Sequence, residues 1–301
     1  MSRRHLTMLL VLAAIWGSSF MFIKIGVRNG FAPSTLVFLR MLLGALTLLP
    51  IVLVAVGAQE AVRQLRTAWL PLVIIGAANS AVPIWALSWA EKRIDSGLAA
   101  VLQASAPLFT ALLAFGFSHA DRVRGARLAG LVVGFGGVAL LVGVQPSGDL
   151  LACVAVVFTA LCYAGSALYA ARGLPTLSPL VTSLGALTAA TVLLAPAGIA
   201  QAPSSSPPLK AWGSILVLGV AGTGVAYILY YALLAGAGAS TSILVTYLVP
   251  AIALGYGVVL LGEPLTATSV AGLALVLLGV ALGTGTVRRR RRSAEAPSLA
   301  S

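Results

Sequence analysis

The sequence predicts an all-α integral membrane protein of ten transmembrane helices, arranged as two inverted repeats of five helices. Three observations lead to this prediction: an apolar composition, ten stretches long enough to cross a bilayer, and an internal repeat. Of the 301 residues, 59% are hydrophobic and only 9% are charged. A soluble domain carries roughly 25% charged residues, because water must wet its surface. The composition therefore excludes an ordinary soluble protein.

The apolar stretches follow one another with short connections, and each matches the thickness of a bilayer core. Each must be helical, because lipid offers no hydrogen-bond partner to a peptide group. The first stretch follows Arg3 and Arg4 as in a secretory signal, but it runs from Leu6 to Ile23 and further stretches follow, so we expect it to remain as a helix. The predicted spans are residues 6–25, 35–56, 69–89, 97–117, 126–145, 149–170, 179–200, 211–234, 240–261 and 267–286.

The charges predict the orientation. The net charge is +12, but the basic residues lie in short connections and in one terminal run, a pattern typical of membrane orientation and not of nucleic-acid binding. With a cytoplasmic N-terminus, thirteen basic residues fall in inner segments and four in outer loops, so both termini are expected in the cytoplasm of a bacterial-type inner membrane. The inner set is Arg3, Arg4, Arg63, Arg66, Arg122, Arg124, Arg127, Arg172 and Arg288 to Arg292; the outer set is Arg28, Lys92, Arg93 and Lys210.

The chain repeats itself. An offset of 143 residues pairs Gly76 with Gly219 and Pro107 with Pro250. Because each half holds an odd number of spans, the second half must enter the membrane from the opposite side. Inverted repeats are typical of secondary transporters, whose substrate site lies near the midplane between the halves. The expected division is a first five-helix repeat at 1–147, a second, inverted one at 148–287, and a basic cytoplasmic tail at 288–301.

Four segments carry a family resemblance: AIWGSSFMFIKIG, FLRMLLGAL, LQASAPLFTALL and LVPAIALGYGVVLLGEPLT. With them, residues 6–286 resemble the ten-helix EamA-type carriers of the drug/metabolite transporter superfamily. The resemblance implies a carrier, in most cases an exporter, of amino acids, other metabolites or toxic compounds. The first half departs from the pattern: where the second half has Gly262-Glu263-Pro264, it has Ser118-His119-Ala120-Asp121, with the acidic residue displaced by one at the 143 offset.

Polar residues inside the predicted spans mark a candidate site, since they are costly in lipid. Asn79 lies near the middle of the third span, Gln103 lies one turn before Pro107, and its repeat mate Thr246 lies one turn before Pro250. The two prolines are candidate hinges, because each leaves a carbonyl without its helical partner. The polar side chains could line a substrate cavity or could hold helices together.

Aromatic residues extend the candidate set. Trp16 and Tyr163 occupy matching places in the two halves, and rings at this depth could line a pocket or could pack between helices. Rings at span ends are more often interface belts. The candidate substrate-binding residues are Trp16, Ser19, Asn79, Trp85, Gln103, Tyr163, Tyr227, Thr246 and Tyr247.

A charge cluster is expected toward the outer face, where Lys24 and Arg40 lie near Glu91 and Asp95. The resemblance to the EamA-type carriers includes these two basic residues, since the family also shows such a pair. One interpretation is snorkelling cations held by the two carboxylates. The other is an outer gate, or a landing place for a substrate carboxylate.

The remaining chemistry is mostly excluded. No catalytic constellation, metal-ligand spacing or nucleotide-binding loop is present, so no enzyme, metal or cofactor is expected. Cys153 and Cys162 lie nine residues apart on one helix, about 13 Å along its axis, too far to form a disulfide.

The predicted function is export of a small neutral or zwitterionic metabolite, such as an amino acid, by alternating access. The expected partners are this small molecule and the lipid bilayer; the oligomeric state stays open between monomer and homodimer. The alternatives are multidrug or toxic-compound efflux and, from another class, a passive channel or scramblase.

Overall fold

The computed structural model describes residues 2–117, 126–143, 149–173 and 177–283, and every regular element in these ranges is a helix. The predicted basic tail and the Ser118-His119-Ala120-Asp121 segment lie outside the described residues. The helices in chain order are α1 (Arg3–Arg28), α2 (Pro33–Ala55), α3 (Ala58–Thr67), α4 (Trp69–Ile75), η1 (Gly76–Ala81), α5 (Val82–Ala90), α6 (Ser96–Gln103), α7 (Ala106–Phe117), α8 (Ala126–Gly143), α9 (Leu150–Gly173), α10 (Pro179–Ala200), α11 (Leu209–Leu216), η2 (Val217–Val225), α12 (Ala226–Ala237), α13 (Ala239–Ser242), α14 (Val245–Leu261) and α15 (Ala267–Gly283).

Seven helical segments of the described chain are long and apolar enough to cross a membrane, and three further apolar helices are shorter. The prediction of an all-helical, multi-pass membrane protein is therefore confirmed. The exact number of ten spans and their inverted repeat stay predictions. The seven long segments are Arg3–Arg28, Pro33–Ala55, Trp69–Ala90, Ser96–Ala114, Leu150–Arg172, Pro179–Ala200 and Leu209–Ala237; the shorter ones are Leu128–Gly143, Val245–Leu261 and Ala267–Gly283.

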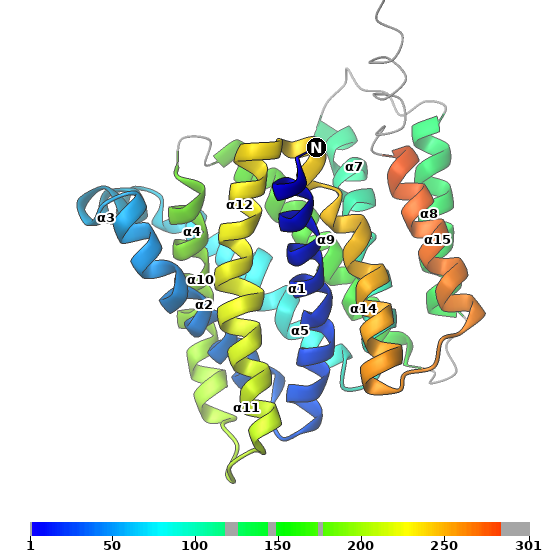
Figure 1. The fold of residues 1–301 in the computed structure, drawn as a ribbon, viewed down its shortest axis with the longest axis horizontal. Helices are drawn as coiled ribbons and strands as arrows, with labels where there is room; N and C mark the ends of the chain where they lie inside the picture. The colour runs from blue at the N-terminus through cyan, green and yellow to red at the C-terminus, as the bar shows by residue number, and fades with distance from the viewer. Residues whose placement is uncertain (1, 118–125, 144–148, 174–176, 284–301) are drawn as a thin grey trace, which may run out of the picture.

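The long helices lie side by side and give the molecule two ends (Figure 1). The N-terminus marks one end. The other, which we call the distal end, carries the connections 29–32, 91–95, 201–208 and 262–266. Contacts between segments far apart in sequence hold the distal end together: the Ser34 hydroxyl donates to Gln201 Oε1 at 2.9 Å, and Arg93 Nε lies 3.3 Å from Asp149 Oδ2.

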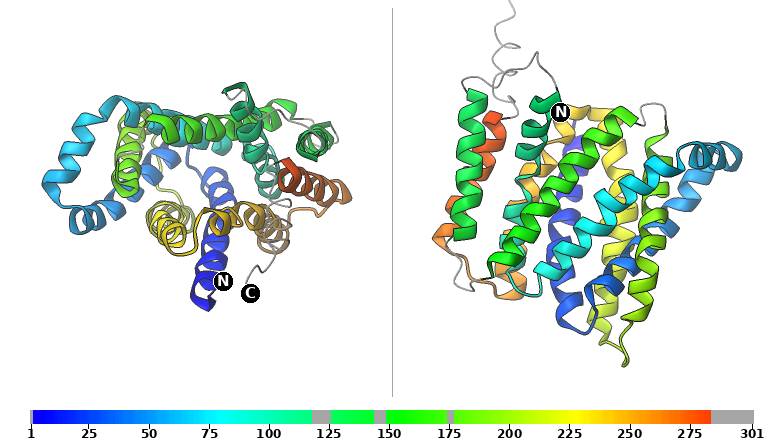
Figure 2. Two further views of the ribbon diagram at one scale, coloured as in Figure 1. Left: turned by 90° about the horizontal axis from the view of Figure 1, so that it is seen from above. Right: turned by 180° about the vertical axis from the view of Figure 1, so that it is seen from behind.

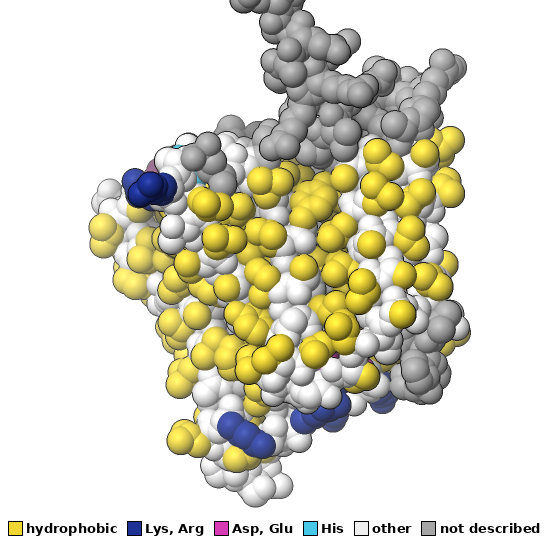
Figure 3. Space-filling view, turned by 45° about the vertical axis from the view of Figure 1, so that its right-hand side comes forward, with side chains coloured by type: hydrophobic (Ala, Val, Ile, Leu, Met, Phe, Trp, Pro, Cys, Tyr) yellow, Lys and Arg dark blue, Asp and Glu magenta, His cyan; other side chains and the backbone are white. Residues whose placement is uncertain are grey.

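The outer surface suits lipid. Large apolar side chains face outward along the helices, as Val54 (89% exposed) and Val259 (78% exposed) do. Figure 3 shows apolar side chains over the flank of the molecule, with Lys and Arg gathered near its ends. An exterior of this kind would be costly in water and is expected in a bilayer.

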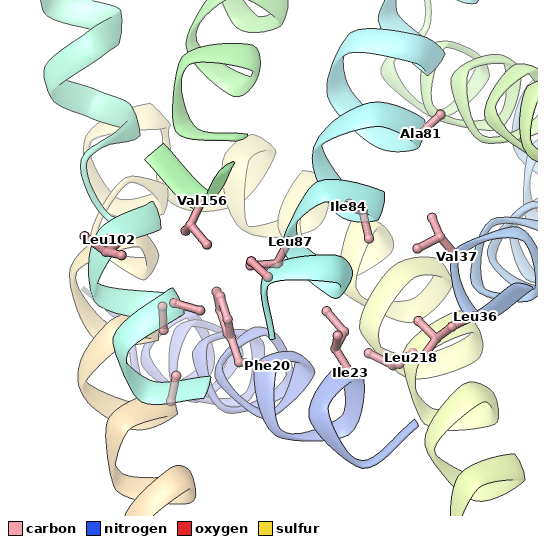
Figure 4. Close-up of a cluster of buried hydrophobic side chains, with 14 of the residues drawn as sticks. Phe20, Ile23, Leu36, Val37, Ala81, Ile84, Leu87, Leu102, Val156 and Leu218 are labelled. Carbon is pink, nitrogen blue, oxygen red and sulfur yellow. The ribbon is translucent and has the colours of Figure 1, made fainter. Parts of the chain in front are cut away.

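One buried cluster joins the two sequence halves. Phe20 and Ile23 of α1 and Leu36 of α2 contribute from the first half, and Val156 of α9 and Leu218 of η2 contribute from the second (Figure 4). Because both halves supply side chains to the same cluster, they pack as one unit.

Close approach between α8 and α15 depends on glycine. The two helices lie together at one side of the bundle (Figure 1). A Cβ on Gly279 would collide with the backbone of Gly134, and a Cβ on Gly134 would lie 3.3 Å from Gly279 Cα. Small residues of this kind allow membrane helices to approach backbone to backbone.

The short helix α3 was predicted only as a connection. It extends sideways from the bundle at the N-terminal end (Figures 1 and 2). Glu60 accepts hydrogen bonds from Arg63 at 2.6 and 2.7 Å and from Gln64 at 2.7 Å, and the bonds from Arg63 and then Gln64 lower the pKa of Glu60 to about 2. Local pairs of this spacing favour a helix, and the apolar residues Ala58, Ala61, Val62 and Leu65 also recur at the spacing of one helical face.

Candidate functional site

A cavity of about 700 Å³ lies in the interior of the bundle, lined by side chains from both sequence halves. This volume falls within the range of small-molecule sites, roughly 300–1,000 Å³. Helices α1, α2, η1, α5, α6 and α7 contribute lining residues from the first half, and α9, α10, η2, α12, α14 and α15 contribute them from the second. Of the predicted candidates, the cavity brings together Trp16, Ser19, Arg40, Asn79, Gln103, Pro107, Tyr163, Tyr227, Thr246 and Pro250.

Interrupted helices position the polar lining. The segments η1 and η2 are π-helical, a geometry frequent at functional sites, and place Asn79 and Thr223 at the cavity. The helix α6 ends at Gln103, three residues after which α7 begins at Ala106. A break at this point is expected because Pro107 cannot donate to the Gln103 carbonyl. In the second half, α14 instead runs through Pro250, and the break lies earlier, between α13 and α14.

The polar side chains interact with one another across the halves. The Tyr163 hydroxyl interacts with the Gln103 side chain, and the Tyr227 hydroxyl with the Asn79 side chain. The Thr159 hydroxyl lies 3.5 Å from Gln103 Oε1, a long contact. Amides and hydroxyls that both donate and accept can satisfy a neutral or zwitterionic ligand.

Aromatic rings form one wall. Trp16 and Tyr230 have ring centroids 5.6 Å apart, and Tyr227 and Tyr231 stack with centroids 6.2 Å apart. The hydroxyls of Tyr231 and Ser183 lie 2.7 Å apart, within hydrogen-bond distance, and this contact holds the Tyr231 ring in place against Tyr227. Trp16 and Tyr227 face the cavity, so apolar ring faces adjoin the polar lining.

Arg40 lies in the cavity wall, and the sequence did not place it there. Its side chain is only 8% exposed, and its Nε donates to Thr223 Oγ1 at 3.1 Å. Its neighbouring turns pack against η2, where a Cβ on Gly219 would meet the Arg40 carbonyl. Arg40 is the one charged residue among the described residues that line the cavity. The sequence grouped it with Lys24 because both are basic and were expected near the outer face.

The rest of the predicted charge cluster lies near the distal end. Lys24 (1% exposed) donates to the Ile94 carbonyl, and Glu91 (0% exposed) interacts electrostatically with Lys24. Among the described residues neither Lys24 nor Arg40 has a carboxylate oxygen within 4.0 Å, so the expected direct ion pairs with Glu91 and Asp95 are absent there. Asp95 is half-buried before α6; burial, followed by the Glu263 carboxylate, raises the pKa of Asp95.

Glu263 has a role that the sequence did not predict. Its carboxylate accepts from the Ser96 N–H and hydroxyl, both at 2.8 Å, and from the Gly97 N–H at 3.1 Å. These donors begin α6, where unpaired N–H groups and the helix dipole favour a negative charge. The Gly262-Glu263-Pro264 sequence was the available signal, but its partner lies 167 residues away in the chain.

Two candidates do not reach the cavity. Trp85 is 42% exposed on the outside of α5, while Ile84 and Leu87 face inward. Successive helical residues are rotated by about 100°, which turns Trp85 away. Tyr247 packs against the buried cluster and is not in the cavity lining.

The described residues offer no group of three His, Cys, Asp or Glu side chains that could hold a metal ion. Cys153 and Cys162 are both free. The arrangement can bind and enclose a small molecule, and the described lining residues include no nucleophile paired with a general base. An apolar exterior around an interior cavity, whose mostly apolar lining holds a few polar groups, is the arrangement expected of a multi-pass membrane transporter.

Comparison with known proteins gives the family. The model of the EamA-like transporter family matches residues 4–143 and again residues 148–284. The chain belongs to this family, which confirms the resemblance noted in the sequence.

Curated relatives share this length and character. The chain is 29% identical to a "Probable terminal-alkyne amino-acid exporter" of Streptantibioticus cattleyicolor, over 96% of each chain. It is 26% identical to the "Uncharacterized inner membrane transporter YedA" of Escherichia coli, over 92% of this chain and 89% of the other. A solved crystal structure, 21% identical, has the same fold, with a TM-score of 0.67 over 96% of this chain and 100% of that one.

Proposed function

We propose that this protein is a secondary-active carrier that exports a small neutral or zwitterionic metabolite, such as an amino acid, across a bacterial-type inner membrane by alternating access. The observation that carries the proposal is the central cavity, which both sequence halves line and which holds amides, hydroxyls and ring faces together. The Streptantibioticus relative is named a probable terminal-alkyne amino-acid exporter, which supports the same class of substrate.

We further propose ten crossings in two inverted repeats. The family model matches each half separately. The π-helical segments support the repeat, because a shift of 143 residues moves Gly76–Ala81 onto residues 219–224, inside η2. With both termini in the cytoplasm, as the basic residues indicate, the distal end faces outward.

With this orientation in the membrane, the structure corresponds to a state in which the cavity is directed toward the cytoplasm. The cavity lining extends toward the N-terminal end through Ala114, Ile243 and Gly283. At the distal end, the buried residues Lys24, Glu91 and Glu263 lie between the cavity and the outside. Opening this end while the N-terminal end closes would expose the same cavity outward, which is the movement expected of inverted repeats.

Counterflow in proteoliposomes tests the carrier. Vesicles holding purified protein and loaded with unlabelled amino acids should accumulate the same labelled amino acid transiently and with saturation. A carrier exchanges one substrate for another, whereas a channel or scramblase lets the label equilibrate without an overshoot. Vesicles loaded with buffer alone are the control. If the label equilibrates without an overshoot for every amino acid that is transported, the protein is a passive channel or scramblase and not a carrier.

Multidrug efflux is a second candidate, favoured by the aromatic wall of Trp16 and Tyr227. Ring faces attract large cationic drugs. The single positive charge of Arg40 in the same cavity disfavours them. Saturable transport of a cationic dye, with no amino acid transported, would support this second candidate over the first.

A further inference from the structure

We propose that Arg40 binds the carboxylate group of the substrate, which makes the central cavity selective for carboxylate-bearing metabolites. The inference rests on the proposed function and narrows its substrate class. No other described residue of the cavity lining carries a charge.

The charge balance of the cavity is the first step. A guanidinium stays protonated in proteins, so the lining carries one fixed positive charge. None of the described lining residues is an Asp or Glu. The groups that act on Arg40 electrostatically are Tyr163 and Tyr227, which are neutral phenols, and Glu91, which is not in the cavity lining. An anionic ligand group would therefore meet attraction here and an ammonium group repulsion.

The orientation of the guanidinium is the second step. The Thr223 hydroxyl donates its own proton to the Leu218 carbonyl at 2.9 Å, across the π-helical turn of η2. Its oxygen is thereby left to accept from Arg40 Nε at 3.1 Å. Nothing in the described chain accepts a hydrogen bond from the two terminal nitrogens, and neither belongs to the fully buried unpaired atoms. A guanidinium held at Nε presents these two nitrogens as a fork that fits a carboxylate.

The alternative role of Arg40 is structural: its positive charge would only neutralise the negative charge of Glu91. That role predicts a direct ion pair, and no Glu91 oxygen lies within 4.0 Å of Arg40. Glu91 is also not in the cavity lining. A cation on a side chain as buried as Arg40, without a carboxylate partner, is costly, and a bound carboxylate would offset that cost.

The remaining lining suits the rest of an amino acid. Asn79 and Gln103 offer amide oxygens to an ammonium group, and the ring faces of Trp16 and Tyr227 offer it cation–π contact. The cavity volume of about 700 Å³ leaves space for a side chain.

The test uses matched ligands. Each of the common amino acids is compared with its primary amide and with the amine that lacks the carboxyl group. Binding to purified full-length protein is measured by thermal stabilisation and then, for each acid that stabilises, by calorimetry. We expect at least one acid to bind at least about ten-fold more tightly than its amide, since a hydrogen-bonded ion pair contributes more than a neutral bond.

The variants separate charge from folding. In Arg40→Gln the preference for acid over amide should fall to near one, through weaker binding of the acid. Arg40→Lys should keep part of the preference, because it keeps the charge and loses the fork. Arg28→Gln removes an exposed guanidinium outside the cavity and should leave the preference unchanged. If Arg40→Gln does not fold, Thr223→Val serves instead, because it removes the hydrogen-bond partner of Arg40 Nε. This variant should bind the acid more weakly and the amide as tightly as the wild type does.

Three results would overturn the proposal: equal binding of acid and amide by the wild type, an unchanged preference in Arg40→Gln or Thr223→Val, or no binding by any acid. Counterflow decides the carrier separately. Acid-selective binding without counterflow would support the Arg40 site and contradict the carrier function. Counterflow of amines alone would support the carrier function and contradict the Arg40 site.

Discussion

Glu263 and Ser96, which are 167 residues apart in the chain, are joined by two hydrogen bonds of 2.8 Å at the distal end. The connection after α14 is thereby fastened to the first turn of α6. Because α6 carries Gln103 at its other end and α14 carries Thr246, this contact holds together two helices that line the cavity. It is the most extensive set of hydrogen bonds that the described residues place across the halves at that end.

Breaking this contact should open the distal end. Glu263→Ala removes three hydrogen bonds to one carboxylate, and bonds to charged groups contribute about 1.5–3 kcal/mol each. We expect a cysteine at Ser19, in a background with Cys153 and Cys162 replaced by alanine, to react faster with an impermeant reagent added outside. The rate is measured in right-side-out vesicles.

Glu60→Ala is the matched control, since it removes an exposed carboxylate at the other end. It should not change the labelling rate at Ser19. Equal rates in Glu263→Ala and the parent protein would mean that the contact does not control access.

The cavity residues should contribute to binding. Gln103→Ala or Thr246→Ala should each weaken substrate binding by roughly ten-fold, because losing one polar contact to a buried group costs about 1–3 kcal/mol. Trp85→Ala is the control, since its side chain faces outward. Calorimetry with the transported amino acid measures the effect, and normal affinity in both folded variants would remove these two residues from the site.

The orientation can be measured by labelling. Single cysteines at Ala58 and Ser118 should react only from the cytoplasm, and those at Ala32 and Ser206 only from outside, because basic residues are concentrated in the segments expected inside. A cysteine at Ser293, in the basic tail, should also react only from the cytoplasm. Labelling of Ser118 and Ser206 from the same side would contradict the five-plus-five arrangement.

The glycine contact between α8 and α15 should be essential for stability. Gly279→Ala places a Cβ against the Gly134 backbone, which cannot move aside as a side chain could, so we expect a loss of about 1–3 kcal/mol in unfolding free energy. Gly136→Ala is the matched control: nothing lies within 4 Å, and alanine favours a helix over glycine by about 1 kcal/mol. Thermal unfolding of the two variants should therefore shift in opposite directions, and a Gly279→Ala protein as stable as Gly136→Ala would contradict the close packing.

Much of the architecture could be predicted from local features. Lipid forces apolar stretches of bilayer length to be helical, so the spans follow from composition alone. Polar groups are costly there, which singled out Asn79 and Gln103, and both line the cavity. The short helix α3 was missed although Ala58, Ala61, Val62 and Leu65 recur at the spacing of one helical face, because it is too short and too polar to be a membrane span.

The sequence by itself determined that the chain is a helical membrane protein of the EamA type, and which few polar residues lie deep within it. Only the tertiary structure decided which of them face one another. The rotation of α5 turned Trp85 outward, and the packing of α2 on η2 turned Arg40 inward, away from the charges with which the sequence had grouped it. The bond between Glu263 and the start of α6 likewise depends on helices far apart in the chain. Helix formation is dictated by neighbours a few residues away, whereas the direction of a side chain in the bundle is set by packing between helices, which no local pattern encodes.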